Sequence, residues 1–260
     1  MIAGAREFAQ WFAEFRDQFV VIGGVALVAV MQEAQQQVRA TKDLDLVLIV
    51  EALTPAFGQR FWEYIEAGGY EVRQRSDGHP TFYRFRRPAD GNQAFLREIE
   101  LFARAPVALP ALAEDQRIVP IPLGEEVSSL SAILLDQDYY EFLIAGRREI
   151  DGVPLIGEDR LIPLKALAWM RQRDARAAGD HVDTRNIDKH LGDVLDLAVL
   201  LVPGQVVPGQ VMRLPGRMAQ DLSDFMALAA EDPMERFNQA TRDSRAERLT
   251  LVAAAFGIEA

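Results

Sequence analysis

Apolar positions follow two different periods along the first part of the chain. Residues 3–19 carry large apolar side chains three and four positions apart, which predicts a packing helix. Short apolar runs at 19–22 and 44–50 predict strands, and the unbroken second run is typical of a strand buried on both faces. Between them, 25–37 is rich in alanine and valine and predicts a helix. The chain is therefore expected to begin as helix, strand, helix, strand.

A helix and several strands are predicted next. The helix begins near Pro55, because proline suits the first helical turn, and ends at the glycine pair 68–69. Strand-like runs follow at 70–75, 81–86, 95–103 and 117–123. Two prolines interrupt the last run, which predicts an edge strand or an extended connection. We place a domain boundary near Gly124, so that 1–124 forms a core domain with an N-terminal helix.

The second half is predicted to be mostly helical. Helical patterns cover 138–145, 161–178, 184–201 and 216–256, strand-like runs lie at 129–135 and 149–156, and a loop with three prolines covers 203–215. We expect an α+β protein with a mixed-sheet core in 1–124 and a C-terminal, mostly helical domain in 125–260 that closes a cleft over the core.

Composition narrows the possible chemistry. The 260 residues include 49% hydrophobic and 26% charged residues, as in ordinary globular proteins. The absence of cysteine excludes disulfides, thiolate metal sites and a cysteine nucleophile, and three scattered histidines do not favour zinc. No apolar stretch of about 18 residues is present and no signal-peptide pattern opens the chain, so we expect a cytoplasmic protein without a membrane partner.

Two carboxylates mark the second predicted strand. Asp43 and Asp45 are two positions apart, so that their side chains point to the same face. Neighbouring carboxylates repel each other and persist most easily around a divalent cation. Gly23 and Gly24, at the end of the first strand, would let the backbone approach a phosphate and leave the N–H groups of the next helix free.

A two-metal phosphoryl-transfer site needs a further carboxylate from a neighbouring strand. Glu98 and Glu100 share one face of the run 95–103. Glu100 is the better candidate because its neighbours in the sequence are apolar, where an unpaired charge is costly.

The net charge of −11 argues against broad binding to nucleic acid. Seven arginines are nevertheless concentrated between residues 73 and 104, namely Arg73, Arg75, Arg84, Arg86, Arg87, Arg97 and Arg104. They indicate either a local channel for nucleic acid or an exposed sheet with solvated charges.

The motifs in which these residues stand resemble a known superfamily. Gly23-Gly24-x-Ala-Leu, Arg39-x-Thr-x-Asp-x-Asp-Leu and Ile99-Glu-Leu-Phe resemble the DNA polymerase β-type nucleotidyltransferases, and within them the AbiEii/AbiGii toxin-like family. Segments 129–140, 163–169 and 182–194 resemble the same family, so that the likeness covers roughly residues 20–200.

This resemblance implies a polymerase β-like core and Mg²⁺-dependent transfer of a nucleoside monophosphate from an NTP to an acceptor hydroxyl. Asp43, Asp45 and Glu100 would hold the metal ions, with Glu100 also drawing the proton from the acceptor. The nucleotide would be bound by Gly23, Gly24, Arg39, Thr41, Lys165 and Asp193. By analogy the acceptor would be RNA, tRNA in particular, and an antitoxin protein would be a partner in a toxin–antitoxin or phage-defence system.

Two other functions stay open. The same core could modify a small cationic molecule, as aminoglycoside nucleotidyltransferases do, which would suit the acidic composition. A core without activity could instead bind a nucleotide or a protein partner, although the presence of all three carboxylates favours an enzyme.

Overall fold

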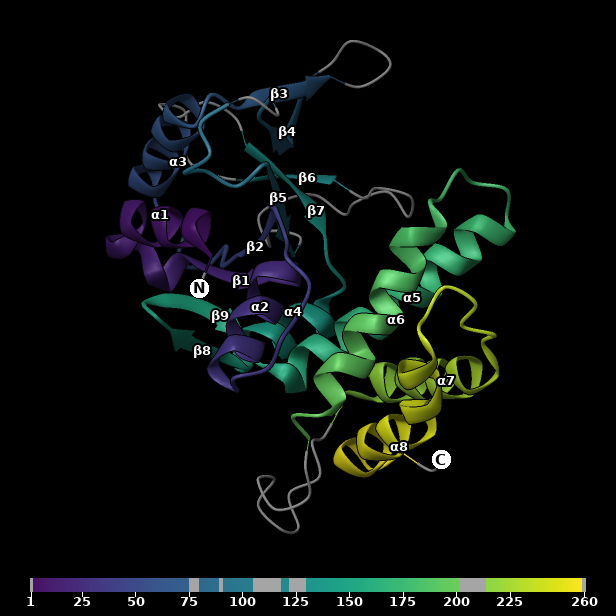
Figure 1. The fold of residues 1–260 in the computed structure, drawn as a ribbon. Coiled ribbons are helices and arrows are strands. Elements are labelled where there is room, and N and C mark those ends of the chain that lie inside the picture. The colour runs from purple at the N-terminus through teal and green to yellow at the C-terminus, as the bar shows by residue number, and fades with distance from the viewer. Residues whose placement is uncertain are drawn as a thin grey trace. The chain divides into compact units, whose positions relative to one another are not determined.

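The computed structural model describes residues 2–74, 80–88, 91–104, 118–121, 130–201 and 214–258. The chain divides into two compact units, Met1–Ile156 and Gly157–Ala260 (Figure 1). The first unit contains the sheet and the second consists of helices in its described part.

The first unit opens with α1 (Ala3–Trp11), the 3₁₀ helix η1 (Ala13–Gln18), β1 (Phe19–Ile22) and α2 (Gly23–Glu33). One helix over 3–19 was predicted, but Phe12 leaves the helical region at φ −110° and divides it. Helix α2 ends before the predicted residue 37, because Gln35 adopts the left-handed φ of 58°.

The remaining elements follow the predicted order. They are β2 (Asp43–Leu48), α3 (Pro55–Ala67), β3 (Glu71–Gln74), β4 (Pro80–Arg86), β5 (Glu98–Ala103), β6 (Ile118–Ile121), β7 (Leu130–Leu134), α4 (Gln137–Ala145), β8 (Arg147–Ile150) and β9 (Val153–Ile156). At the start of α3 the Thr54 hydroxyl accepts a hydrogen bond from the Phe57 amide, and Pro55 takes the first helical position.

The strands form one mixed sheet in the order β3-β4-β5-β2-β1-β9-β8. Strand β2 is antiparallel to β1 and parallel to β5, which makes it a central strand. Strand β4 is antiparallel to the first half of β5, and β7 continues beside the second half and pairs with β6. This topology places the predicted carboxylate strands side by side.

The first unit extends beyond the boundary that we predicted at residue 124. Strand β9 pairs in parallel with β1, with Val21 opposite Leu155. Strands β8 and β9 form a hairpin whose turn residues, Asp151 and Gly152, both have positive φ (52° and 79°), as a type I′ turn requires. The single strand predicted over 149–156 is therefore two strands, and both belong to the sheet. Gly124 itself lies outside the described residues.

The two faces of the sheet differ in chemistry. One face carries Phe19 from β1, Leu46 from β2 and Ile99 from β5, all fully buried. Aromatic rings from α1, η1 and α3 cover it, and they include Phe8, Phe12, Phe57, Phe61 and Tyr64. The large apolar area buried here is the main contribution to the stability of this unit. Because strand residues alternate, the other face carries the residues between these positions.

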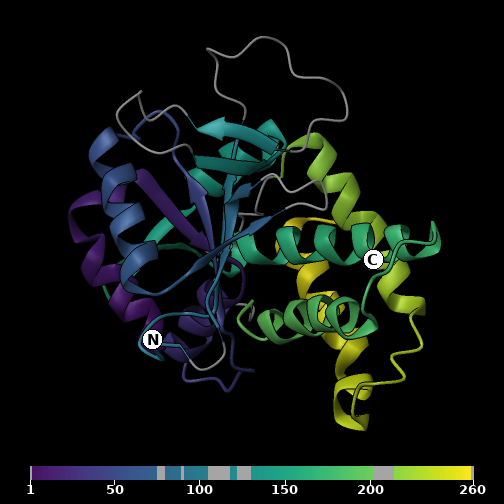
Figure 2. The ribbon, with the colours of Figure 1, turned by 90° about the horizontal axis from the view of Figure 1, so that it is seen from above.

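The second unit contains α5 (Glu158–Ala177), α6 (Thr184–Ala198), α7 (Gly216–Glu231) and α8 (Gln239–Phe256). Helices α5 and α6 lie side by side (Figures 1 and 2). The apolar stripe predicted for α6 is buried, and Asp183 caps this helix by accepting a hydrogen bond from the Arg185 amide at 2.9 Å. These elements confirm the predicted α+β class, with a mixed sheet and a mostly helical C-terminal part.

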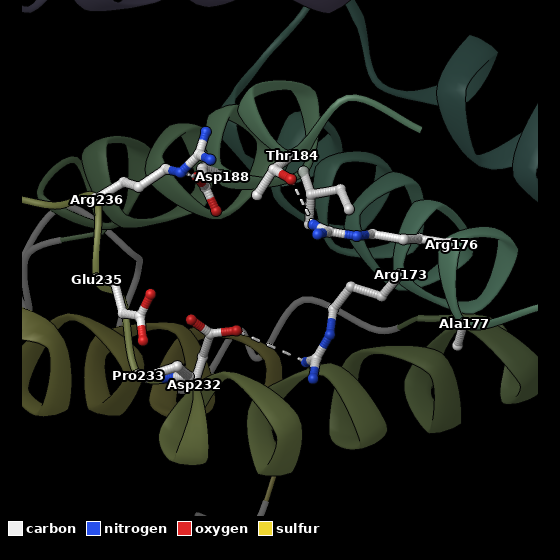
Figure 3. Close-up of a pocket in the computed structure, with 10 residues that line it drawn as sticks. Arg173, Arg176, Ala177, Thr184, Asp188, Asp232, Pro233, Glu235 and Arg236 are labelled. Carbon is white, nitrogen blue, oxygen red and sulfur yellow. Dashed lines mark hydrogen bonds and ion pairs between the residues drawn. The ribbon is translucent and has the colours of Figure 1, made fainter. Parts of the chain in front are cut away.

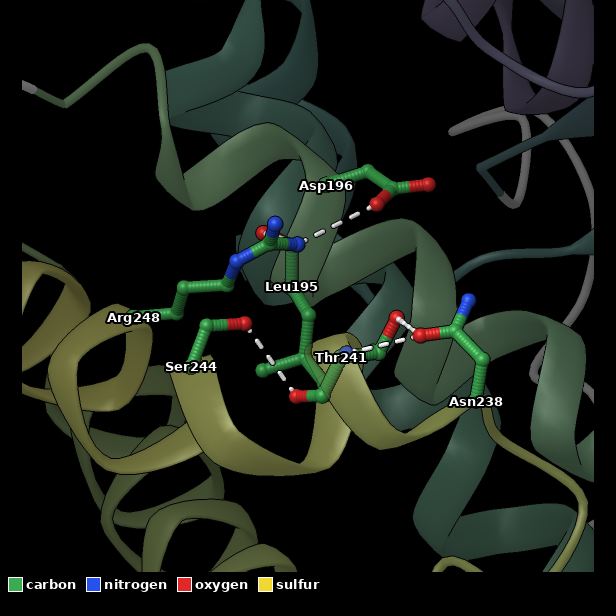
Figure 4. A network of polar contacts seen from close by, with 6 residues as sticks. All are labelled: Leu195, Asp196, Asn238, Thr241, Ser244 and Arg248. Carbon is green, nitrogen blue, oxygen red and sulfur yellow. Dashed lines mark hydrogen bonds and ion pairs between the residues drawn. The ribbon is translucent and has the colours of Figure 1, made fainter.

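Polar contacts join α8 to α6 (Figure 4). The Arg248 guanidinium donates to the Leu195 carbonyl at 3.1 Å and to Asp196 Oδ1 at 3.3 Å, at the end of α6 where carbonyl groups lack helical partners. Asn238 caps α8 through its side-chain oxygen, which accepts from the Thr241 amide at 2.8 Å.

Candidate active site

Asp43 and Asp45 lie on the sheet face opposite the aromatic core. Both are partly buried. Leu44, which lies between them in the sequence, and Leu46, which follows Asp45, are fully buried on the other face. Strand β2 thus buries one side completely and presents two carboxylates on the other, as the alternation predicted.

Strand β5 adds carboxylates in register with them. The parallel pairing of β2 and β5 sets Asp43 opposite Glu98 and Asp45 opposite Glu100. Paired residues of neighbouring strands point to the same face, so four carboxylates from two strands share this part of the sheet. We call these four residues the carboxylate cluster.

The pKa of the Glu100 carboxyl is strongly perturbed. It is raised to about 7: burial is the largest cause of the rise, the Arg84 guanidinium opposes it, and the negative charges of Asp45 and Glu98 add to it. The dependence on Asp45 shows that the two carboxylates interact electrostatically. A perturbed carboxyl beside a second one is typical of functional sites.

Two arginines of β4 complete the charged face. Arg84 lies opposite Glu100 and Arg86 opposite Glu98. Arg84 Nε forms an ion pair with Glu100 Oε1 and lies 3.6 Å from Glu98 Oε1, and Arg86 Nε lies 3.7 Å from Glu98 Oε2. These ion pairs were not predicted from the sequence. The Arg-x-Arg spacing of β4 matches the Glu-x-Glu spacing of β5, but this match is informative only once the two strands are known to pair.

The arginines predicted as a possible channel for nucleic acid have internal partners. Arg87 is buried and donates from Nε to the Phe95 carbonyl at 3.1 Å. Arg104 pairs with Glu51. Arg75 and the side chain of Arg73 lie outside the described residues. These contacts favour a structural role for Arg87 and Arg104 over a role in binding nucleic acid.

The two glycines lie against the residues around β2. Gly23 has a φ of +67°, and a Cβ there would overlap Asp45 Oδ2. A Cβ at Gly24 would come within 2.5 Å of Thr41 Oγ1. Glycine is therefore required at both positions for the close approach of α2 and the aspartate strand.

Thr41 and Arg39 precede β2. The Thr41 hydroxyl accepts a hydrogen bond from the Asp43 amide at 3.4 Å, which orders the backbone where the strand begins. Arg39 is partly exposed two residues earlier.

A metal ion was predicted between Asp43, Asp45 and Glu100. Across the described ranges, no group of three or more His, Asp or Glu side chains has the arrangement of a metal site. The Glu100 carboxylate forms an ion pair with Arg84. The donor set itself fits a hard divalent cation, because all three ligands are carboxylate oxygens and repulsion between them would be relieved by a cation.

Lys165 of α5 and Asp193 of α6 form a buried ion pair in the second unit. The distance between Lys165 Nζ and Asp193 Oδ2 is 2.8 Å, and the two residues are 4% and 1% exposed. Lys165 is therefore not a surface lysine. A buried charge of this kind needs its partner, so the two residues act as one unit.

A pocket of about 430 Å³ also lies in the second unit, between the ends of α5 and α6 and the segment 232–236 (Figure 3). Its charges pair with each other: Arg173 lies 3.9 Å from Asp232 and Arg236 lies 3.6 Å from Asp188. Burial raises the pKa of the Asp188 carboxyl, and Arg236 opposes this shift. None of the predicted site residues lines this pocket. Its balanced charges do not favour a highly charged nucleotide.

Comparisons with known proteins give distant structural neighbours. No protein-family model and no curated protein matches the chain. An antigenic nucleotidyltransferase-like protein from Paracoccidioides brasiliensis is 16% identical, with a TM-score of 0.47 over 98% of this chain and 97% of that one. A proposed nucleotidyltransferase from H. pylori is 14% identical, with a TM-score of 0.42 over 97% and 91% of the two chains. JHP933 from Helicobacter pylori is 14% identical, with a TM-score of 0.43 over 97% and 88%.

Because these identities and TM-scores are low, the function proposed below depends on the sequence motifs and on the side-chain geometry. In the part of the chain that the structure describes, no helix is both long enough and apolar enough to span a membrane.

Proposed function

We propose that this chain is an Mg²⁺-dependent nucleotidyltransferase that moves a nucleoside monophosphate from an NTP to an acceptor hydroxyl. The observation that carries the proposal is the register of β2 and β5, which sets Asp45 opposite Glu100 on the face away from the core. The motifs that resemble polymerase β-type nucleotidyltransferases fall on this same place, at Gly23-Gly24, on β2 and on β5.

The carboxylate cluster would hold the metal ions. Asp43 and Asp45 project from one strand and Glu100 from the next, so three carboxylates from a rigid sheet are available to oxygen-seeking cations. When bound, Mg²⁺ would neutralise the charge that develops on the phosphate oxygens during transfer.

Glu100 would also take the proton of the acceptor hydroxyl. In the metal-free protein its pKa of about 7 leaves a large ionised fraction near neutral pH. In this state the Arg84 guanidinium opposes the rise of the Glu100 pKa.

The glycine pair and the start of α2 would bind the triphosphate. The N-cap residue of α2, Ile22, has no side chain that can cap the helix, so its first N–H groups could bind an anion. Thr41 and Arg39, which precede β2, would add contacts to the phosphates. The bound phosphates would then lie next to Asp45, against which Gly23 packs.

By analogy with the family, Lys165 and Asp193 of the second unit would take part in nucleotide binding. In this proposal Asp193 holds Lys165 in one orientation through the 2.8 Å contact, and the lysine supplies positive charge to the phosphates.

RNA, and tRNA in particular, is the acceptor that the resemblance supports, and a toxin-like role with an antitoxin partner follows the same analogy. The net charge of −11 and the internal pairing of Arg84, Arg86 and Arg104 favour a second candidate, a small cationic acceptor of the aminoglycoside type.

Radiolabelled NTPs distinguish these acceptors. The protein is incubated with Mg²⁺, each α-labelled NTP and either total tRNA or an aminoglycoside, with Asp45→Asn as the matched inactive control. Label on tRNA supports the first candidate and label on the small molecule the second. If neither acceptor nor the protein itself becomes labelled with any NTP, the proposal of nucleotidyl transfer is wrong.

A further inference from the structure

We propose that Arg84 is an internal counter-ion of Glu100 that a divalent cation displaces, after which its guanidinium binds the phosphates of the nucleotide. The inference rests on the proposed function and deepens it, because it assigns a positioning role to a residue outside the motifs that carry the resemblance.

The position of Arg84 is fixed by the sheet. The pairings of β2 with β5 and of β5 with β4 set Asp45, Glu100 and Arg84 in one row across three strands. All three therefore point to the same face. A cation that is held between Asp45 and Glu100 would lie next to the arginine in this row.

Arg84 holds the carboxylate that metal binding requires. Its Nε forms ion pairs with both Glu100 and Glu98, whereas the described contact of Arg86 is with Glu98. A divalent cation and a guanidinium compete for the same carboxylate oxygens. Because the Glu100 carboxylate cannot bind the cation and the Arg84 guanidinium equally well at the same time, metal binding would weaken its contact with Arg84.

The side chain of Arg84 has room to leave its ion pair. Its Nε is buried and lies in ion-pair contact with Glu100 and Glu98. The side chain is 33% exposed, which leaves the guanidinium room to move. The ring of Tyr83 lies 5.9 Å from the guanidinium carbon and offers a second favourable surface.

The released guanidinium has a suitable new partner. Arginine presents a planar fork of donors that matches phosphate oxygens, and it remains charged at every relevant pH. A nucleotide that arrives with the metal brings such oxygens to this row. The same residue would therefore stabilise the empty site and then the occupied one.

Manganese binding without nucleotide tests the first half of this inference. Free Mn²⁺ is counted by electron paramagnetic resonance in titrations at about pH 8.5, where protons compete little for the carboxylates. We expect Arg84→Gln to bind Mn²⁺ roughly tenfold more tightly than the wild type, because the guanidinium that competes with the metal for the Glu100 carboxylate is removed. Arg86→Gln, the matched control on the same strand, should change the Mn²⁺ affinity much less. Arg84→Lys keeps the charge and should bind Mn²⁺ like the wild type.

Nucleotide binding tests the second half. In the presence of Mg²⁺, Arg84→Gln and Arg84→Lys should both bind a non-hydrolysable NTP analogue roughly tenfold or more weakly, because neither offers the bidentate fork. If Arg84 had only a structural role, its replacement would weaken the binding of both Mn²⁺ and the NTP analogue, or would change neither. Tighter metal with weaker nucleotide is therefore the signature of exchange.

The outcomes separate this inference from the proposed function. If Asp45→Asn binds Mn²⁺ as well as the wild type does, the carboxylate cluster is not a metal site and the proposed function fails with it. If Asp45→Asn loses Mn²⁺ but Arg84→Gln binds it no more tightly, the metal site stands and the role of Arg84 is overturned. Arg84→Lys, which preserves the ion pair, gives a folded comparison should the glutamine variant unfold.

Discussion

Asp45 of β2 and Glu100 of β5 lie directly opposite each other in parallel register, on the sheet face that the aromatic core leaves free. Such a pair does not stabilise a sheet, because like charges directly opposite each other on neighbouring strands repel. In the proposed function a divalent cation binds between these two carboxylates and relieves their repulsion.

Asp45→Asn is expected to abolish nucleotidyl transfer without weakening the fold. The amide keeps the shape of the side chain but removes a metal ligand, so activity should fall by roughly a hundredfold to a thousandfold or more. Relief of repulsion should leave the free energy of unfolding unchanged or up to about 1 kcal/mol higher. Urea denaturation and labelled-NTP assays measure both effects, with the exposed Asp17→Asn as control. A variant that is both active and less stable would contradict this role.

Glu100 should make the metal-free protein less stable as the pH rises. Its pKa is about 7 in the folded chain and 4.5 in the unfolded one, so the folded state holds the proton more tightly. The resulting stabilisation is present below the unfolded pKa and is lost as the pH rises from 4.5 through about 7. Glu100→Gln should flatten this part of the profile, which urea denaturation at a series of pH values would show. An unchanged slope would mean that another group titrates there.

Gly23 and Gly69 provide a matched pair for the contact between α2 and Asp45. Their φ angles are +67° and +65°, but a Cβ at Gly69 meets nothing within 4 Å, whereas one at Gly23 overlaps Asp45 Oδ2. Gly69→Ala should lose roughly 1–2 kcal/mol of unfolding free energy from backbone strain alone. Gly23→Ala carries the same strain and must also displace Asp45, so it should lose more and should impair Mn²⁺ binding. Equal losses with unimpaired Mn²⁺ binding would show that Gly23 does not pack against the site.

The sequence predicted the elements that local chemistry determines. Asp45 and Glu100 were found because alternation on a strand can be read without a partner strand. The hairpin at Asp151-Gly152 lies within the run predicted as one strand over 149–156, and its place in the sheet depends on the long-range pairing of Val21 with Leu155. The difference in the domain boundary has the same origin.

The missing part of the site has a related explanation. Arg84 was assigned with other arginines to a possible surface for RNA, because charge density can be read along a chain but charge pairing cannot. Its partner Glu100 is sixteen positions away and meets it only through the pairing of β4 with β5. The ion pair between Glu100 and Arg84 could therefore not be predicted from spacing alone.

The buried pair of Lys165 and Asp193 gives the last prediction. The assignment of Lys165 to nucleotide binding predicts that its replacement by alanine weakens NTP binding. The structure adds an effect on stability, because Lys165→Ala would leave Asp193, which is 1% exposed, as an uncompensated buried charge. Lys165→Met or Asp193→Leu alone should therefore lower the free energy of unfolding by roughly 3–5 kcal/mol.

The double variant separates stability from function at this pair. Lys165→Met with Asp193→Leu removes both charges, so it should regain most of the stability that either single change loses. If Lys165 also binds phosphate, the double variant should be folded but should bind NTP roughly 10–150-fold more weakly, the range expected for a charge-assisted contact. Urea denaturation followed by circular dichroism and NTP titration of the refolded protein measure the two quantities. A stable double variant with wild-type NTP affinity would show that the pair serves the fold of the second unit and takes no part in nucleotide binding.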